Sequence, residues 1–141
     1  MKYVFDSCGA FKWVVAEVLT TEALRLRDEY RSAVHELIAP DLFPVEVGHV
    51  LTRAERQGRI NPSQSAVLWH NVMMTAPILI PYLPLMPRAI ELSSQFRVGV
   101  YDCLYVALAE REACELVTAD DRLVKTLSPQ FSFVISLAAV P

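Results

Sequence analysis

The chain has 141 residues, of which 53% are hydrophobic and 21% are charged, and its formal net charge is -3. This composition is too apolar for a disordered chain and the length is sufficient to bury a core, so we expect one domain over residues 1–141. The small negative charge excludes the overall basic field that is typical of nucleic-acid-binding domains. A nucleic-acid partner would therefore have to contact a local basic patch or a metal ion.

The first half of the chain alternates short β-branched runs with amphipathic segments. Short strands are predicted at residues 3–5 and 37–40. Helices are predicted at residues 11–18, 20–37 and 44–58. Thr20 or Thr21 would cap the second helix, and Pro44 and Gly58 are typical of the start and the end of the third.

The second half repeats this alternation. Helices are predicted at residues 61–75, 87–96, 101–114 and 119–128. Strands are predicted at residues 77–81, 115–118 and 131–137. Strands separated by helices indicate right-handed βαβ units, which build a parallel sheet covered by helices on both faces. The predicted fold class is therefore α/β.

Cysteine usage and the apolar stretches indicate a soluble cytoplasmic protein. Cys8, Cys103 and Cys114 are odd in number and lack C-x-x-C spacing, which argues against a disulfide framework or a zinc ribbon. The opening residues MKYVFD have no apolar signal-peptide region. The most hydrophobic stretch, residues 72–87, contains four prolines, so a membrane helix is not expected there.

Four acids fall where a parallel sheet gathers its ligands. Asp6 and Asp120 follow predicted strands, while Glu46 and Asp102 lie in the first turns of predicted helices. Because ligands of open α/β sheets bind beyond the carboxyl ends of the strands, we expect all four at one edge. Taken singly, each acid could instead interact with the dipole of a nearby helix or lie in solvent.

A cluster of these four acids would need a cation. Neighbouring carboxylates raise one another's pKa unless positive charge neutralises them, and no Lys or Arg recurs at matching positions. Oxygen-only ligands select Mg²⁺ or Mn²⁺ over zinc. Such a metal is typical of enzymes that act on phosphate groups, with Glu46 as one candidate for the general base.

Cations are expected to flank the acids if the substrate carries phosphate groups. Lys12, Arg53 and Arg122 are the candidates for substrate binding, with Arg56 and Lys125 nearby in sequence. Solvated surface charge is the alternative for each of them. Trp13 could stack on a base, or pack in the core.

Four segments in order resemble PIN-domain ribonucleases of the VapC-like toxin group: VFDSCGAFKW, APDLFPVEVGHVLTRAERQG, YDCLYVALAE and LVTADDRL. The resemblance implies a three-layer α/β/α sandwich with a mainly parallel sheet. It also implies that Asp6, Glu46, Asp102 and Asp120 hold Mg²⁺ or Mn²⁺ and catalyse RNA cleavage. An antitoxin protein that occludes the site, and a homodimer, are the implied partners.

Two accessory positions and one departure follow from the same resemblance. Ser7 could supply a hydroxyl to the site, and Asp121 could be an accessory acid or a helix cap. The subgroup with Lys-Trp after the first acid usually reads D-A-S, whereas this chain reads D-S-C, so Cys8 replaces a serine hydroxyl.

Two other functions remain open from the sequence. A different Mg²⁺-dependent phosphate hydrolase would need a nucleophilic Asp with a nearby Lys. A non-catalytic PIN-like binding or assembly module would be compatible with the D-S-C departure. Residues 62–76, which are apolar over more than one helical face, could form a surface for self-association or antitoxin binding, or could be core.

Overall fold

The computed structural model describes residues 1–141 and contains one parallel sheet. Its strands are β1 (Lys2–Phe5), β2 (Glu36–Pro40), β3 (Ile78–Ile80), β4 (Glu115–Thr118) and β5 (Val134–Ser136). They lie in the order β3-β2-β1-β4-β5, and every neighbouring pair is parallel. Val4 of the central strand pairs with Ile38 on one side and Leu116 on the other.

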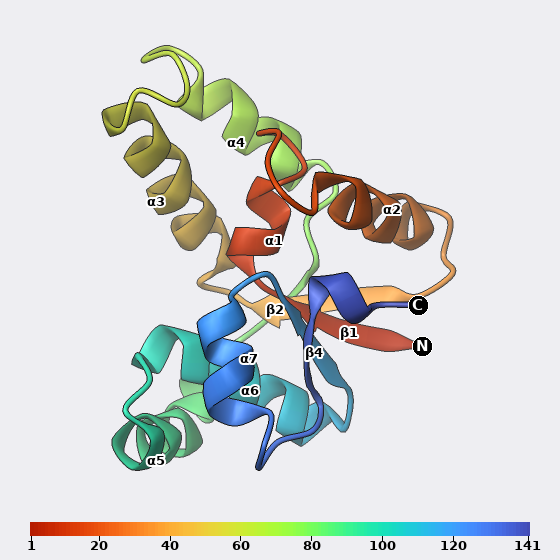
Figure 1. The fold of residues 1–141 in the computed structure, drawn as a ribbon, viewed down its shortest axis with the longest axis vertical. Helices are drawn as coiled ribbons and strands as arrows, with labels where there is room; N and C mark the ends of the chain where they lie inside the picture. The colour runs from red at the N-terminus through yellow and green to blue at the C-terminus, as the bar shows by residue number, and fades with distance from the viewer.

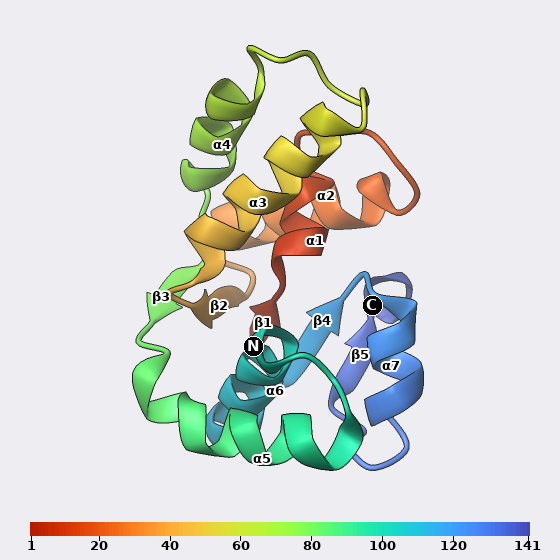
Figure 2. The same cartoon turned by 90° about the vertical axis from the view of Figure 1, so that its left-hand side faces the viewer.

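Helices cover both faces of this sheet (Figures 1 and 2). They are α1 (Ser7–Phe11), α2 (Thr20–Arg31), α3 (Phe43–Arg56), α4 (Ser65–Met73), α5 (Met86–Phe96), α6 (Val100–Glu112) and α7 (Asp121–Leu127). Two short 3-10 helices, η1 (Leu83–Leu85) and η2 (Leu137–Ala139), complete the chain. Helices α1 to α4 lie on one side and α5 to α7 on the other. The predicted α/β/α sandwich is confirmed.

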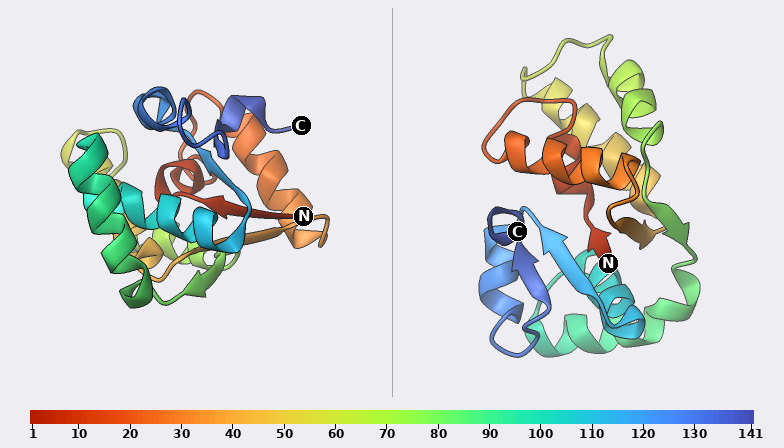
Figure 3. Two further views of the ribbon diagram at one scale, coloured as in Figure 1. Left: turned by 90° about the horizontal axis from the view of Figure 1, so that it is seen from below. Right: turned by 90° about the vertical axis from the view of Figure 1, so that its right-hand side faces the viewer.

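The strand order places a topological switch between β1 and β4. From β1 the chain builds outward to β2 and β3, then crosses to the other face and adds β4 and β5. Figure 3, right, shows the red arrow of β1 and the blue arrows of β4 and β5 pointing toward the side where α1 begins. In doubly wound sheets a ligand crevice forms at such a switch, beyond the carboxyl ends of the strands.

The core is built on the two central strands and α6. Val4, Phe5 and Val117 are fully buried in the sheet, as a parallel strand covered on both faces requires. Helix α6 packs against β1, β2 and β4, and residues Cys103 to Ala109 are buried without interruption. Each large apolar side chain buried here stabilises the fold by about 1.5–3 kcal/mol. This packing fixes the strand ends from which the functional loops leave.

The predicted helix at residues 11–18 is wrong, because the helix begins earlier. Asp6 caps α1 by accepting a hydrogen bond from the Gly9 backbone N–H, so the helix starts directly after β1 and ends at Phe11. The segment that follows is held instead by the ion pair between Lys12 and Glu17.

The predicted caps and end of the next helix also differ. Leu19, with a φ of 68°, is the N-cap of α2, and the hydroxyl of Thr20 accepts a hydrogen bond from the Glu17 N–H. The helix stops at Arg31 rather than continuing to residue 37, because Ala33 has a left-handed φ of 58° that starts a turn.

Several other expectations are resolved by burial. Trp13 is a core residue: its ring stacks on Phe5 and its Nε1 donates to the Ala23 carbonyl.

All three cysteines are free thiols. The apolar segment around α4 is split, because Val72 is fully buried while Val67 and Met74 are exposed. None of the helices combines the length and the apolar character that a membrane span needs.

Candidate active site

The four predicted acids all lie at the carboxyl edge of the sheet. Asp6 follows β1 and Asp120 follows β4, each as the N-cap of the next helix. Glu46 lies in the first turn of α3 and Asp102 in the first turn of α6. Because α3 and α6 cover opposite faces, the acids come from both layers to the switch between β1 and β4 (Figure 1).

Asp6 is the most enclosed of the four. The residue is 8% exposed; Oδ1 accepts a hydrogen bond from the Gly9 N–H at 2.8 Å and Oδ2 accepts one from the hydroxyl of Thr118. Burial raises its pKa to about 6, with further increases from Asp102 and Asp120, although the two hydrogen bonds act in the opposite direction. No Lys, Arg or His pairs with Asp6, so within the protein only these two hydrogen bonds favour its charged form.

Gly9 allows this arrangement, because the first turn of α1 passes directly over the ring of Phe5. A Cβ atom at Gly9 would overlap that ring, which is fully buried at the end of β1. The glycine thus lets the capped helix, and with it Asp6, lie against the core.

Thr118 connects two of the acids, a role that the sequence reading missed. Its hydroxyl donates to Asp6, and the same oxygen accepts the Asp120 N–H at 3.0 Å. Asp120 in turn caps α7, since its Oδ1 accepts the N–H groups of Arg122 at 3.0 Å and Leu123 at 3.3 Å. Asp120 therefore both caps α7 and belongs to the acidic cluster.

Glu46 has a partner that was also missed. The hydroxyl of Tyr105 on α6 donates to Glu46 Oε1 at 2.7 Å across the two layers. Burial raises the pKa of Glu46 to about 7, with Tyr105 opposing and Asp102 and Asp6 adding to the rise. Tyr105 lies three residues after Asp102, on the same face of one helix, which is the signal that could have identified it.

Four more residues at the carboxyl edge are Asp102, Cys8, Ser7 and Asp121. Burial and then Asp120 raise the pKa of Asp102. Desolvation of the thiol, followed by the charges of Asp6, Asp102, Asp120 and Glu46, raises the pKa of Cys8 to about 12, although the residue as a whole is exposed. All four carboxylates act on the pKa of this one thiol, which agrees with their position at one edge of the sheet. Ser7 is buried in the first turn of α1, and Asp121 is exposed on α7.

The chemistry of this donor set fits a hard divalent cation. None of the four acids forms an ion pair with Lys, Arg or His. No group of three or more His, Cys, Asp or Glu side chains is arranged to hold a metal ion directly. Hard ions of the Mg²⁺ type use few carboxylates and keep several waters, so a loose oxygen-only cluster with excess negative charge matches them.

The predicted substrate-binding cations have different environments. Lys12 is almost buried, and its Nζ lies 2.8 Å from Glu17 Oε1, so that charge is already paired. Arg59 also pairs with Glu17, at 2.6 Å. Arg53 on α3 and Arg122 on α7 are exposed.

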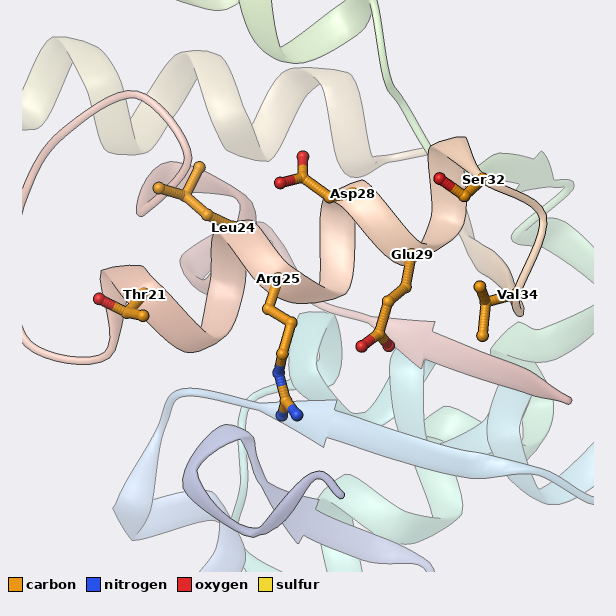
Figure 4. A pocket seen from close by; sticks show the side chains of 7 residues that line it. All are labelled: Thr21, Leu24, Arg25, Asp28, Glu29, Ser32 and Val34. Atoms are coloured by element: carbon orange, nitrogen blue, oxygen red, sulfur yellow. The ribbon is translucent and has the colours of Figure 1, made fainter.

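Two pockets differ in their relation to the acids. A pocket of about 270 Å³ contains Asp102 and Asp120 in its wall, so it is continuous with the acidic edge. A second pocket, of about 490 Å³, runs along α2 from Thr21 to Val34 (Figure 4). It contains none of the four acids and is therefore not part of the candidate active site.

Comparisons with known proteins agree with this geometry. The model of the PIN domain family matches residues 3–126. Ribonuclease VapC1 from two strains of Mycobacterium tuberculosis is 40% identical over 128 residues, covering 84% of this chain and 89% of each relative. The crystal structure of PAE2754 from Pyrobaculum aerophilum superimposes with a TM-score of 0.68 at 18% identity, over 98% of this chain and 93% of that one. The last similarity supports the fold alone.

Proposed function

Because the chain belongs to the PIN-domain family, and within it to the VapC-like ribonucleases, we propose that it is a divalent-metal-dependent endoribonuclease and the toxin of a toxin–antitoxin pair. The observation that carries the proposal is the group of four acids at the switch between β1 and β4. Their charges act on one another and are balanced by no protein cation.

In this proposal Asp6, Glu46, Asp102 and Asp120 would hold Mg²⁺ or Mn²⁺, one or two of them directly and the others through the waters that the ion keeps. A bound ion of this kind supplies an activated water at neutral pH and stabilises charge on the phosphate oxygens.

The protein's own groups orient the acids. Gly9 and Thr118 fix both oxygens of Asp6, and Tyr105 fixes Oε1 of Glu46. Oε1 of Glu46 is bonded to Tyr105, which leaves Oε2 as the oxygen that would take a proton from the attacking water.

The alternative of a phosphatase with a nucleophilic aspartate has no support in the geometry. That chemistry needs a free lysine beside the acid, and the ammonium of Lys12 is committed to Glu17. RNA therefore remains the proposed phosphate substrate.

The proposed partners are a cognate antitoxin protein and a second copy of the chain. Val67 and Met74, which are 59% and 81% exposed, support a protein-binding surface at α4. The three free thiols support a reducing compartment, so we place the protein in the cytoplasm.

The proposed function is tested by incubating the purified protein with a panel of RNAs, with Mn²⁺ or with EDTA, and mapping the cleaved ends. The wild type should cleave with Mn²⁺ and not with EDTA. Asp6→Asn should reduce the rate at least about 100-fold. Asp28→Asn, an exposed acid on α2, is the matched control and should cleave normally.

The nucleophile can be checked in the same assay. Because water attacks the phosphorus, a 2′-deoxy nucleotide at the cleaved position should still allow cleavage, and no cyclic phosphate should form. Cleavage that survives EDTA, or that Asp6→Asn leaves unchanged, would contradict the proposed function.

A further inference from the structure

We propose that the pocket beside Asp102 and Asp120 binds a phosphate of the RNA backbone next to the cleaved bond, and that Arg97 and Arg122 are its cations. The inference rests on the proposed ribonuclease function and adds a binding site to it. The pocket, of about 270 Å³, lies between the α5–α6 loop and the start of α7. Its lining includes Arg97, Val98, Gly99, Asp102, Asp120 and Arg122.

Both arginines are free to bind a ligand. Neither guanidinium makes an ion pair or a hydrogen bond to the protein, although two carboxylates line the same pocket. Most other arginines donate to protein oxygen atoms or pair with acids, namely Arg25, Arg27, Arg31, Arg59, Arg88 and Arg111. Arg53 and Arg56 on α3 are also unpaired, but only Arg97 and Arg122 line the pocket that contains Asp102 and Asp120.

The backbone that carries each arginine is fixed. Arg97 ends α5 with a left-handed φ of 56°, and its N–H donates to the Ser93 carbonyl at 2.9 Å. The hydroxyl of Ser93 then donates to the Val98 carbonyl at 2.6 Å, which closes the turn. Arg122 is held in the first turn of α7 by its N–H bond to Asp120. Donors on a fixed backbone lose less freedom when a ligand binds.

Charge decides which ligand this pocket accepts. An RNA strand that brings one phosphate to the acids also brings its neighbours close to Asp102 and Asp120, which repel them unless cations intervene. Arginine meets that need, because its planar guanidinium can donate two hydrogen bonds to one phosphate.

The lining also argues against a base in this pocket. Val98 and Leu123 are its apolar members and no aromatic side chain is present, so the pocket offers a base no aromatic stacking partner. A phosphate contact carries no sequence information, and the pocket should therefore contribute equally to every RNA that binds.

The test measures RNA binding without cleavage. Full-length protein with Asp6→Asn serves as the background, and a fluorescent single-stranded RNA oligonucleotide is titrated by anisotropy. Arg97→Ala and Arg122→Ala should each weaken binding about fivefold to tenfold. Each should also reduce the slope of log affinity against log salt by about 0.7, the value for one lost phosphate contact on a single strand.

Two further variants control for charge and folding. Arg111→Ala makes the same charge change at the far end of α6, where Arg111 pairs only with Glu112, and should bind within about twofold of the background. Arg97→Gln keeps most of the side chain at the left-handed position and should show the same loss as Arg97→Ala.

A chemical substitution locates the contacted phosphate. A single uncharged methylphosphonate is placed at successive linkages of the RNA. The background protein should lose affinity at one linkage beside the cleaved bond, and the Arg97→Ala/Arg122→Ala protein should be insensitive there. Equal sensitivity in both proteins, or normal RNA binding by both single variants, would overturn the proposal.

The two proposals fail in different ways. If the wild type cuts no RNA but the arginine variants still lose RNA affinity, the nuclease function is wrong, and the pocket is a phosphate-binding site with no cleaved bond beside it. If the wild type cuts RNA and the arginine variants bind it normally, the pocket proposal is wrong and the nuclease function stands.

Discussion

Two carboxylates on either side of α1 have pKa values that are shifted in opposite directions, because only one of them has cation partners. Glu17, in the loop after the helix, is half-buried, and burial alone would raise its pKa; the bonds from Lys12 and Arg59 lower it below the usual value. Asp6, before the helix, has no cation, and its pKa is raised to about 6. The protein thus neutralises one enclosed acid and leaves the other charged.

The difference shows that the acidic edge lacks the positive charge that the protein provides at Glu17. The pair of cations around Glu17 ties the end of α1 to the loop that follows α3, so it serves the fold. At the carboxyl edge of the sheet, burial raises the pKa of Asp6, Glu46 and Asp102, and the charges of neighbouring acids add to the rise. A buried charge of this kind is costly unless a ligand compensates it.

The largest expected effects, on RNA cleavage and on stability, come from replacing one acid of the unpaired cluster and one acid that is paired with cations. Asp102 accepts no side-chain hydrogen bond, so Asp102→Asn should leave the fold intact while reducing RNA cleavage at least about 100-fold. Its thermal unfolding temperature should stay equal or rise, because a repulsive charge is lost. Cleavage rates and thermal scans on the same preparations check both outcomes.

Glu17→Gln should give the reverse pattern. It leaves Lys12 almost buried without its partner, so the free energy of unfolding should fall by about 1–3 kcal/mol while the rate constant of cleavage stays within about twofold. If Glu17→Gln abolishes cleavage in a folded protein, or Asp102→Asn unfolds it, the contrast between the two regions is lost.

The pH dependence of stability should show the same contrast. Asp6 and Glu46 have pKa values of about 6 and about 7 in the folded protein, above the usual 3.8 and 4.5, so the folded state binds more protons than the unfolded state between these values. The free energy of unfolding without metal should therefore fall as pH rises from about 4 to about 7, by on the order of 2–3 kcal/mol for Asp6 alone.

Urea unfolding at pH 5 and pH 8, with EDTA present, measures this change. Asp6→Asn should flatten the profile over that window. The lowered pKa of Glu17 acts in the opposite direction, and its stabilisation is lost only as pH falls below the usual carboxyl range. Stability that rises steadily from pH 5 to pH 8 would rule out the raised pKa values.

The contact between α1 and the core gives a smaller effect. Gly9→Ala should lower the free energy of unfolding by about 1–2 kcal/mol, because the added methyl overlaps the buried ring of Phe5. Gly99→Ala is the control, since a Cβ there meets no atom within 4 Å, and it should change stability by less than about 0.5 kcal/mol. Equal effects of the two substitutions in chemical denaturation would argue against the close approach.

The smallest effect should come from the hydroxyl that orients Glu46. Tyr105→Phe removes the donor to Oε1 and should weaken Mn²⁺ binding about threefold to tenfold without changing the unfolding temperature by more than a few degrees. Tyr101→Phe, an exposed tyrosine on the same helix, is the control. In a Glu46→Gln background the effect of Tyr105→Phe should disappear, and an effect that persists would show that Tyr105 does not act through Glu46.

The sequence predicted the sheet and the placement of the acids well, for a physical reason. Fully buried strands such as residues 115–118 are short apolar runs, and an acid directly after such a run lies at the carboxyl edge in any parallel α/β fold. The order of the strands did not need to be known for Asp6 and Asp120 to be placed together. Their role as metal ligands stays a prediction.

The contacts that orient the acids were not predictable in the same way. Tyr105 reaches Glu46 from another layer and Thr118 reaches Asp6 from another strand, so both bonds depend on tertiary packing. The start of α1 was misplaced because Asp6 was considered only as a ligand, although a carboxylate before a helix also caps it. Lys12 was predicted as a substrate cation because its partner, Glu17, is brought near it only by the turn after α1.

The most direct test of the central claim is calorimetric titration of Mn²⁺ into the metal-free wild type and into Asp6→Asn. Four uncompensated acids should bind the ion in the wild type and release protons near pH 6.5, since Asp6 and Glu46 are partly protonated there. Asp6→Asn should bind at least about tenfold more weakly. Equal affinity in both proteins, or no binding by the wild type, would contradict the account.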